Sequence, residues 1–98
     1  MASNLIYRAA ERAFGAEALM VDGIEECCRL QRELMRCARD GEKPVATEEL
    51  AERIAAMKVL IERITALLGI KEDVQRCRNE EISKLAAKVQ AHYGGDWK

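Results

Sequence analysis

Residues 47–68 read TEELAERIAAMKVLIERITALL, and this stretch decides the fold class of the chain. Its apolar side chains recur three or four positions apart, which is the spacing of one face of an α-helix. Thr47 is a favourable N-cap and Gly69 follows the last apolar residue, so we expect a helix from Thr47 to Leu68. The predicted apolar stripe consists of Leu50, Ile54, Met57, Leu60, Ile61, Ile64, Leu67 and Leu68.

The sequence on either side of this stretch predicts three more helical segments. The first runs from about Ser3 to Phe14, where Gly15 interrupts it, and the second covers residues 16–39. The last spans residues 70–92. A short polar loop joins the segments 16–39 and 47–68, so we expect these two to form an antiparallel hairpin with the other helices laid against it.

Length and composition agree with a small all-α protein. The chain has 98 residues, of which 49% are hydrophobic, 34% charged and 4% aromatic, with a single proline. This predicts one domain over residues 1–98 with a flexible tail at 94–98. Because so small a helical domain has a large surface for its volume, we expect a homodimer or a higher homo-oligomer to complete the bundle.

Charge and cysteine usage argue against several classes of partner. Sixteen basic and seventeen acidic residues leave a net charge of −1, so we expect neither nucleic-acid binding nor attraction to an anionic membrane. No apolar run approaches membrane-spanning length, and the N-terminal residues lack a signal-peptide pattern. The four cysteines form no C-x-x-C pair, so we expect reduced, buried thiols, no zinc site and a cytoplasmic location.

Charged residues fall within or beside the apolar faces of the long segments. In segment 16–39 we expect an inward face of Met20, Ile24, Cys27, Gln31, Leu34 and Ala38, with Glu26 at its border and Glu33 outward. Unpaired buried charge is destabilising, so inward charges must pair, bind a ligand or face a wet cavity. The residues concerned are Glu26, Glu49, Arg53, Arg78 and Glu81.

Several stretches together carry a family pattern. They are Phe14-Gly15, IEECCRL at residues 24–30, RDG at 39–41 and ERIAAMKVLIE at 52–62, followed by a last helix at 74–85. Over roughly residues 14–89 the chain resembles the MazG-like all-α nucleoside triphosphate pyrophosphohydrolases, the small phage and bacterial members in particular. The resemblance implies a helical hairpin with flanking helices, in a bundle that oligomerisation completes.

The resemblance also implies a site. In that family an E-E-x-x-E segment and an E-x-x-D segment place four carboxylates around Mg²⁺ ions, which bind the phosphates and help to form the hydroxide that releases pyrophosphate. Here Glu25 and Glu26 match the opening pair, but Arg29 stands at the third acidic position. The E-x-x-D pair falls on Arg53 and Ala56. Of the four ligand positions, only Glu26 keeps its carboxylate.

The exchange of acids for arginines sets the functional expectation. Two guanidinium groups repel a divalent cation, so we expect no bound metal or other cofactor, no hydrolysis, and pairing of Arg53 with Glu26 or Glu81. The leading interpretation is therefore a non-catalytic binding or scaffold homo-oligomer. No catalytic residue is assigned.

Two alternatives stay open. One is an active Mg-dependent pyrophosphohydrolase whose ligands have moved to Glu49, Glu52 and Glu62. The other is a metal-free nucleotide sensor, in which basic side chains hold the phosphates directly: Arg29, Arg53, Lys58 and Lys84.

Overall fold

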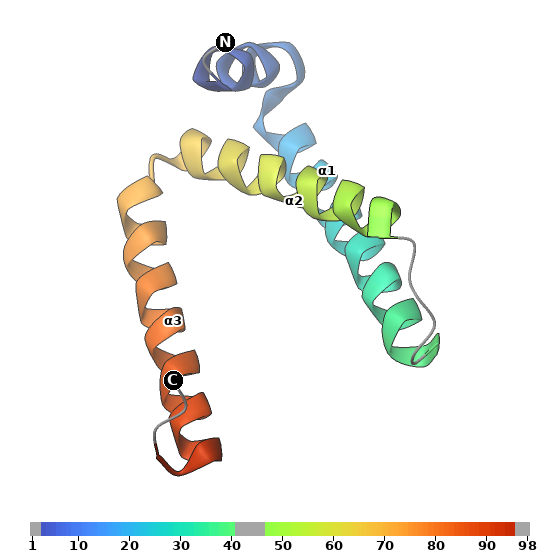
Figure 1. The fold of residues 1–98 in the computed structure, drawn as a ribbon. Helices are drawn as coiled ribbons and strands as arrows, with labels where there is room; N and C mark the ends of the chain where they lie inside the picture. Colours follow the sequence, from blue (N-terminus) through green and yellow to red (C-terminus); the bar gives the residue numbers. More distant parts are fainter. Residues whose placement is uncertain (1–2, 41–46, 96–98) are drawn as a thin grey trace. The chain divides into compact units, whose positions relative to one another are not determined.

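The protein is all-helical over the residues that its computed structural model describes, which are 3–40 and 47–95. The helices are α1 (Ser3–Asp40), α2 (Thr47–Leu68) and α3 (Lys71–Tyr93), as Figure 1 shows. The predicted all-α fold class is confirmed. The two predicted segments before residue 40 form the single element α1, and the predicted loop through Pro44 lies outside the described residues.

A kink at Gly15 divides α1, at the position where the sequence predicts a break. Gly15 has φ 86° and ψ 164°, which lie outside the helical region and are unfavourable for a residue with a side chain. The part before the kink turns onto α2, where the Tyr7 hydroxyl donates a hydrogen bond of 2.5 Å to Oε2 of Glu62. The kink at Gly15 therefore allows the N-terminal part of α1 to reach Glu62, which lies in the C-terminal half of α2.

The chain divides into two compact units after Leu68. The first holds α1 and α2, and the second holds α3. Taken by itself, α3 has no buried residue, and its ion pairs join neighbours on the same helix. Because a single helix is too small to enclose a core, one domain over residues 1–98 stays our prediction.

The helices α1 and α2 form the predicted antiparallel hairpin. Gly23 of α1 lies against Ile64 of α2, whereas Glu26, later in α1, lies against Arg53, earlier in α2. Figure 1 shows α2 lying across the part of α1 that follows the kink. Between Leu19 and Arg39, the buried and half-buried residues of α1 are Leu19, Gly23, Glu26, Leu30, Glu33 and Cys37.

The inward face predicted for segment 16–39 is wrong. Ile24 is 66% exposed and Leu34 is 53% exposed, and Met20, Cys27, Gln31 and Ala38 are exposed as well. Each residue that contacts α2 lies one position before a residue of the predicted face. The observed row is therefore rotated by about 100° around the helix from the predicted one. Gly23 in this row lies against Ile64 of α2, and Glu33 is half-buried rather than outward.

The predicted stripe of α2 is partly correct. Leu60 is buried at 5% exposure, and Leu50, Met57, Ile64 and Leu67 are half-buried. Ile54, Ile61 and Leu68 remain exposed. Among the described residues, Leu19 and Leu60 are the buried hydrophobic side chains, so the hairpin by itself encloses a very small core.

Candidate functional site

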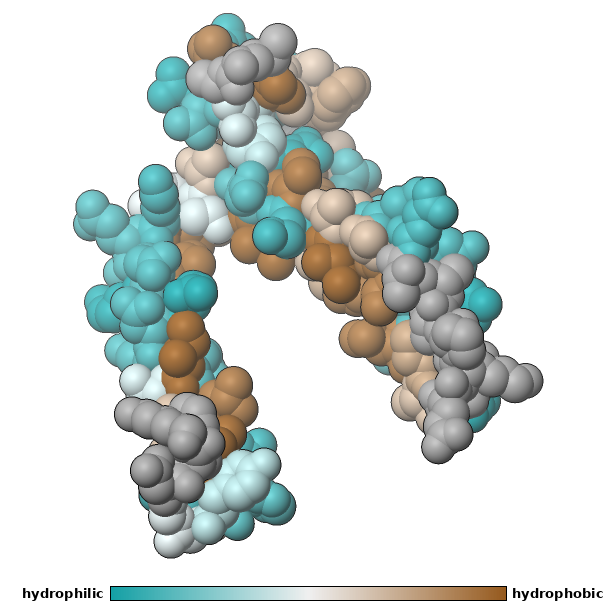
Figure 2. Space-filling model, in the orientation of Figure 1, coloured by the Kyte–Doolittle hydropathy of each residue, from teal (hydrophilic) through white to brown (hydrophobic). Residues whose placement is uncertain are grey.

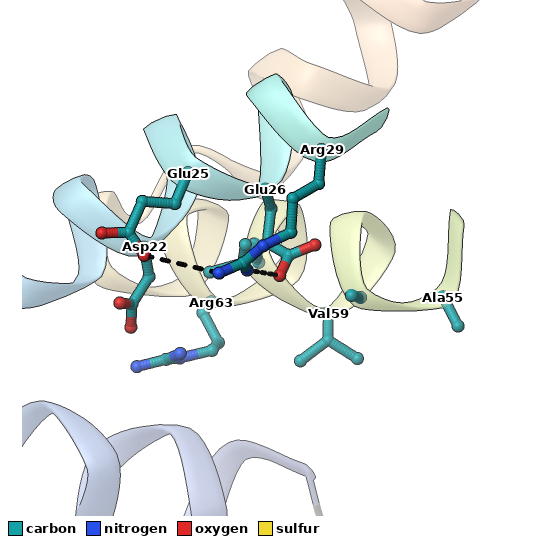
Figure 3. Close-up of a pocket in the computed structure, with 9 residues that line it drawn as sticks. Asp22, Glu25, Glu26, Arg29, Ala55, Val59 and Arg63 are labelled. Carbon is teal, nitrogen blue, oxygen red and sulfur yellow. Dashed lines mark hydrogen bonds and ion pairs between the residues drawn. The ribbon is translucent and has the colours of Figure 1, made fainter. Parts of the chain in front are cut away.

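The positions that the resemblance singled out lie together on one side of the hairpin. A hollow of about 420 Å³ between α1 and α2 contains Glu25, Glu26 and Arg29 from the first helix and Ala56 from the second. Figure 3 shows these α1 side chains converging above α2. The complete lining is Asp22, Glu25, Glu26, Arg29, Ala55, Ala56, Val59, Leu60 and Arg63.

Glu26 is the centre of this site, because it is paired from both helices. Its side chain is 14% exposed, and its Oε1 accepts a hydrogen bond from Nη1 of Arg29 on the same helix. Its Oε2 lies 3.6 Å from Nη1 of Arg53 on α2. That contact is an ion pair but too long for a hydrogen bond, and this buried oxygen has no hydrogen-bond partner among the described residues.

Arg29 joins two acids at once. Its Nη2 lies 3.9 Å from Oε2 of Glu25, and the dashed lines of Figure 3 mark its pairs with Glu25 and Glu26. Arg29 is about half exposed, whereas Arg53 is 31% exposed. Of the two partners expected for Arg53, the structure pairs it with Glu26. The Glu26 carboxylate is thus flanked by two arginines, one from each helix of the hairpin.

A second, smaller hollow of about 260 Å³ lies further along the hairpin. Glu49 lines it together with Arg53, as the sequence leads us to expect for residues one turn apart. Its complete lining is Arg29, Arg32, Glu33, Glu49, Glu52 and Arg53. Three arginines face three glutamates, so this hollow has no net charge with which to attract a cation or an anion.

The remaining predicted residues lie elsewhere. Lys58 is exposed and lines neither hollow, because it is five residues and about 140° from Arg53 around α2. Arg78, Glu81 and Lys84 belong to α3 in the other unit, where all three are exposed. There the Lys84 ammonium lies 3.0 Å from Oε1 of Glu81.

Two functional candidates escaped the sequence analysis. Arg63 is half-buried and lines the first hollow, and no ion pair engages it within the described residues. Its position seven residues after Ala56, on the same helical face, is the signal that could have found it. The second is Tyr7, whose hydrogen bond to the Glu62 carboxylate raises its pKa above the ordinary value of 10.0.

The exposure of the cysteines differs from the prediction. Cys27, Cys28 and Cys77 are exposed and Cys37 is half-buried, so the prediction of buried thiols is wrong for three of the four.

Over residues 3–40 and 47–95, no three His, Cys, Asp or Glu side chains gather closely enough to bind a metal ion. Within the same ranges, no helix combines the length and the apolar character needed to cross a bilayer.

Comparison with models of protein families, with curated proteins and with solved structures finds no match for this chain. Its function is therefore inferred from the geometry of the hairpin.

Proposed function

We propose that this chain is a non-catalytic, MazG-like helical protein that acts as a binding or scaffold homo-oligomer. Its own arginines take the place that Mg²⁺ occupies in active members of the family. One observation carries this proposal: Arg29 and Arg53, from two different helices, both pair with Glu26.

Electrostatics favours an internal ion-pair cluster over a metal site. At about 4 Å and an effective dielectric constant near 20, one unit charge interacts with a divalent ion by on the order of 8 kcal/mol. Arg29 and Arg53 therefore repel such an ion about as strongly as two carboxylates would attract it. The methyl side chain of Ala56 offers no oxygen ligand in compensation.

The test is release of pyrophosphate from nucleoside triphosphates by the full chain, with Mg²⁺ or Mn²⁺ and with EDTA. We expect no metal-dependent release from the wild type, and no difference between wild type and Glu26→Ala. Metal-dependent release that Glu26→Ala abolishes would contradict the proposal. It would favour the pyrophosphohydrolase with relocated ligands, of which Glu49 and Glu52 line the second hollow together with Arg53.

One observation favours metal-free nucleotide sensing as a second candidate. Arg63 lines the hollow of about 420 Å³ without an ion pair in the described residues, and that volume lies within the range of small-molecule sites. A guanidinium group in this setting is suited to hold a phosphate.

Thermal unfolding with ATP or pyrophosphate in the presence of EDTA separates this candidate from the leading proposal. A sensor gains about 4 kcal/mol of stability at a ligand concentration 1,000 times its dissociation constant, whereas a scaffold shows no shift. Arg63→Met should abolish the gain. Lys58→Met, outside both hollows, should leave it unchanged.

A further inference from the structure

The hairpin has a second side, opposite to the charged hollows, on which hydrophobic side chains remain uncovered. Figure 2 shows hydrophobic residues gathered along α1 and α2. Six of them lie on one face of the two helices, which we call the apolar face, and their exposed fractions range from 37% to 66%. These six residues are Met20, Ile24, Leu34, Ile54, Ile61 and Leu68. Helical periodicity places all of them on the same side of the α1–α2 contact.

The middle of the apolar face is a groove of about 390 Å³. It is lined by Met20, Gly23, Ile24, Cys27, Cys28, Met57, Leu60, Ile61 and Ile64. No acidic or basic side chain is among them. This contrasts with the other side of the same helices, where each hollow contains at least two arginines and two acids.

We infer that the apolar face is covered by the apolar face of a second copy of this chain, so that two hairpins form a four-helix bundle around a two-fold axis. The inference rests on the self-association in the proposed function and identifies the surface that performs it. An uncharged face meets an identical face without electrostatic repulsion, which is what a two-fold interface requires.

The area is appropriate for such an interface. A fully exposed Leu or Ile side chain presents on the order of 100 Å² of apolar surface, so six half-exposed side chains leave roughly 300 Å² per chain. A specific interface buries about 800 Å² per partner, of which roughly 60% is apolar. The six residues supply more than half of that apolar area, and Cys27, Cys28 and Met57 extend it.

The competing occupant is α3, and its composition argues against it. Nine of its 23 residues are charged. Arg78 and Glu81 fall between its apolar residues Val74, Ile82 and Leu85, so burying this row of α3 would bury both charged side chains as well.

The first experiment compares two matched substitutions in the full chain. Ile61 and Val59 lie two residues apart on α2 and are 49% and 45% exposed, but Ile61 lines the apolar groove and Val59 lines the charged hollow. We expect a dimer for the wild type and for Val59→Lys by sedimentation velocity. Ile61→Lys should raise the dimer dissociation constant by on the order of a hundredfold or more, because two buried ammonium groups would oppose each other.

The second experiment needs no substitution, so it holds even if Ile61→Lys fails to fold. Cys27 lies in the groove and Cys77 lies on α3, and both are exposed in the single chain. Alkylation by N-ethylmaleimide, followed by mass spectrometry, should modify Cys27 more slowly than Cys77 by on the order of tenfold at high protein concentration. This difference should vanish on dilution below the dissociation constant.

The outcomes separate the surface from the proposed function. A dimer that survives Ile61→Lys, or that Val59→Lys dissociates, overturns the apolar face and leaves self-association standing. Protection of Cys27 that does not change on dilution overturns the second copy in favour of α3. A monomer at every concentration overturns the inference and the oligomeric part of the proposed function, while the pyrophosphate assay still tests the loss of catalysis by itself.

Discussion

At Glu26, one carboxylate has a guanidinium partner on its own helix and another on the facing helix. Position 29 is one turn along α1, and position 53 faces Glu26 from α2. An acid at either place would add an oxygen ligand for a metal, whereas an arginine adds a positive charge. The residue type at positions 29 and 53 therefore decides whether Glu26 is joined by further oxygen ligands or by positive charges.

Reversing those two charges should create metal binding. In the variant Arg29→Glu/Arg53→Glu, four glutamates would cluster where Arg29 and Arg53 now pair with Glu26, and their mutual repulsion would destabilise the hairpin until a divalent ion bound. We expect Mn²⁺ at 100 times its dissociation constant to stabilise this variant by about 2.7 kcal/mol, measured by thermal unfolding. The control Arg8→Glu/Arg12→Glu makes the same change of net charge on the exposed N-terminal part of α1. An equal effect of Mn²⁺ on both variants would contradict the site.

Tyr7 should give the stability a dependence on alkaline pH. Its pKa is raised because its hydroxyl donates to the Glu62 carboxylate, and this hydrogen bond needs the protonated phenol. The stabilisation is therefore complete below the unfolded-state pKa of about 10 and is lost as the pH rises through the higher folded-state value.

Denaturant titrations between about pH 8 and pH 11 would test this dependence. Tyr7→Phe should be less stable than the wild type at the lower pH, and this difference should narrow as the pH rises above about 10. Tyr93, which is exposed on α3, provides the control Tyr93→Phe. A constant difference between wild type and Tyr7→Phe over this range would contradict the role of the hydrogen bond.

At the scale of the elements, two glycines of α1 have opposite roles. Gly15 has a positive φ, so a side chain is strained there even though nothing lies within 4 Å of an added Cβ. Gly23 has helical geometry, and an added Cβ would meet only Cδ1 of Ile64 at 3.6 Å, an ordinary van der Waals contact. The first glycine is required by the backbone, whereas the second merely permits close packing.

Alanine substitutions should therefore change stability in opposite directions. Gly15→Ala should lower the free energy of unfolding by about 1 kcal/mol, because the kink needs a positive φ. Gly23→Ala should raise it by up to about 1 kcal/mol, because alanine favours the helix and the space accommodates a methyl group. Urea denaturation followed by circular dichroism measures both. Destabilisation by Gly23→Ala as large as that by Gly15→Ala would show that the helices tolerate no methyl group at their contact.

At the scale of the whole molecule, few hydrophobic side chains are buried among the residues that the structure describes. Leu19 and Leu60 are the buried ones, whereas side chains such as Ile24 and Leu34 remain exposed. Burial of apolar surface stabilises by about 25 cal/mol for each Å². Self-association, as we propose it, would therefore add to the stability of the folded chain.

We therefore expect the thermal unfolding midpoint to rise with protein concentration, since association stabilises the folded state by mass action. Differential scanning calorimetry over about a hundredfold range of concentration would measure the rise of the midpoint. Over that range, association adds up to about 2.7 kcal/mol to the free energy of unfolding. If the folded chain is a monomer, the midpoint is the same at all protein concentrations. Such a constant midpoint would mean that the single chain covers its own hydrophobic surface.

The sequence by itself determined where the helices lie, where α1 breaks, and that α1 and α2 pair as a hairpin. Helical periodicity, Gly15 and the short connection are local features of the sequence, so reading them requires no knowledge of tertiary contacts. The family resemblance also grouped Glu25, Glu26, Arg29, Arg53 and Ala56, positions that the structure places around the charged side of the hairpin.

Only the tertiary structure decided which row of α1 meets α2. Periodicity defines an apolar stripe, but the side of a helix used for packing depends on how closely the partner can approach and on whether charges at the contact find partners across it. In that row Gly23 lies against Ile64, and Glu26, which is half-buried, pairs with Arg53 across the contact. Met20, Ile24 and Leu34 consequently remain exposed beside the contact.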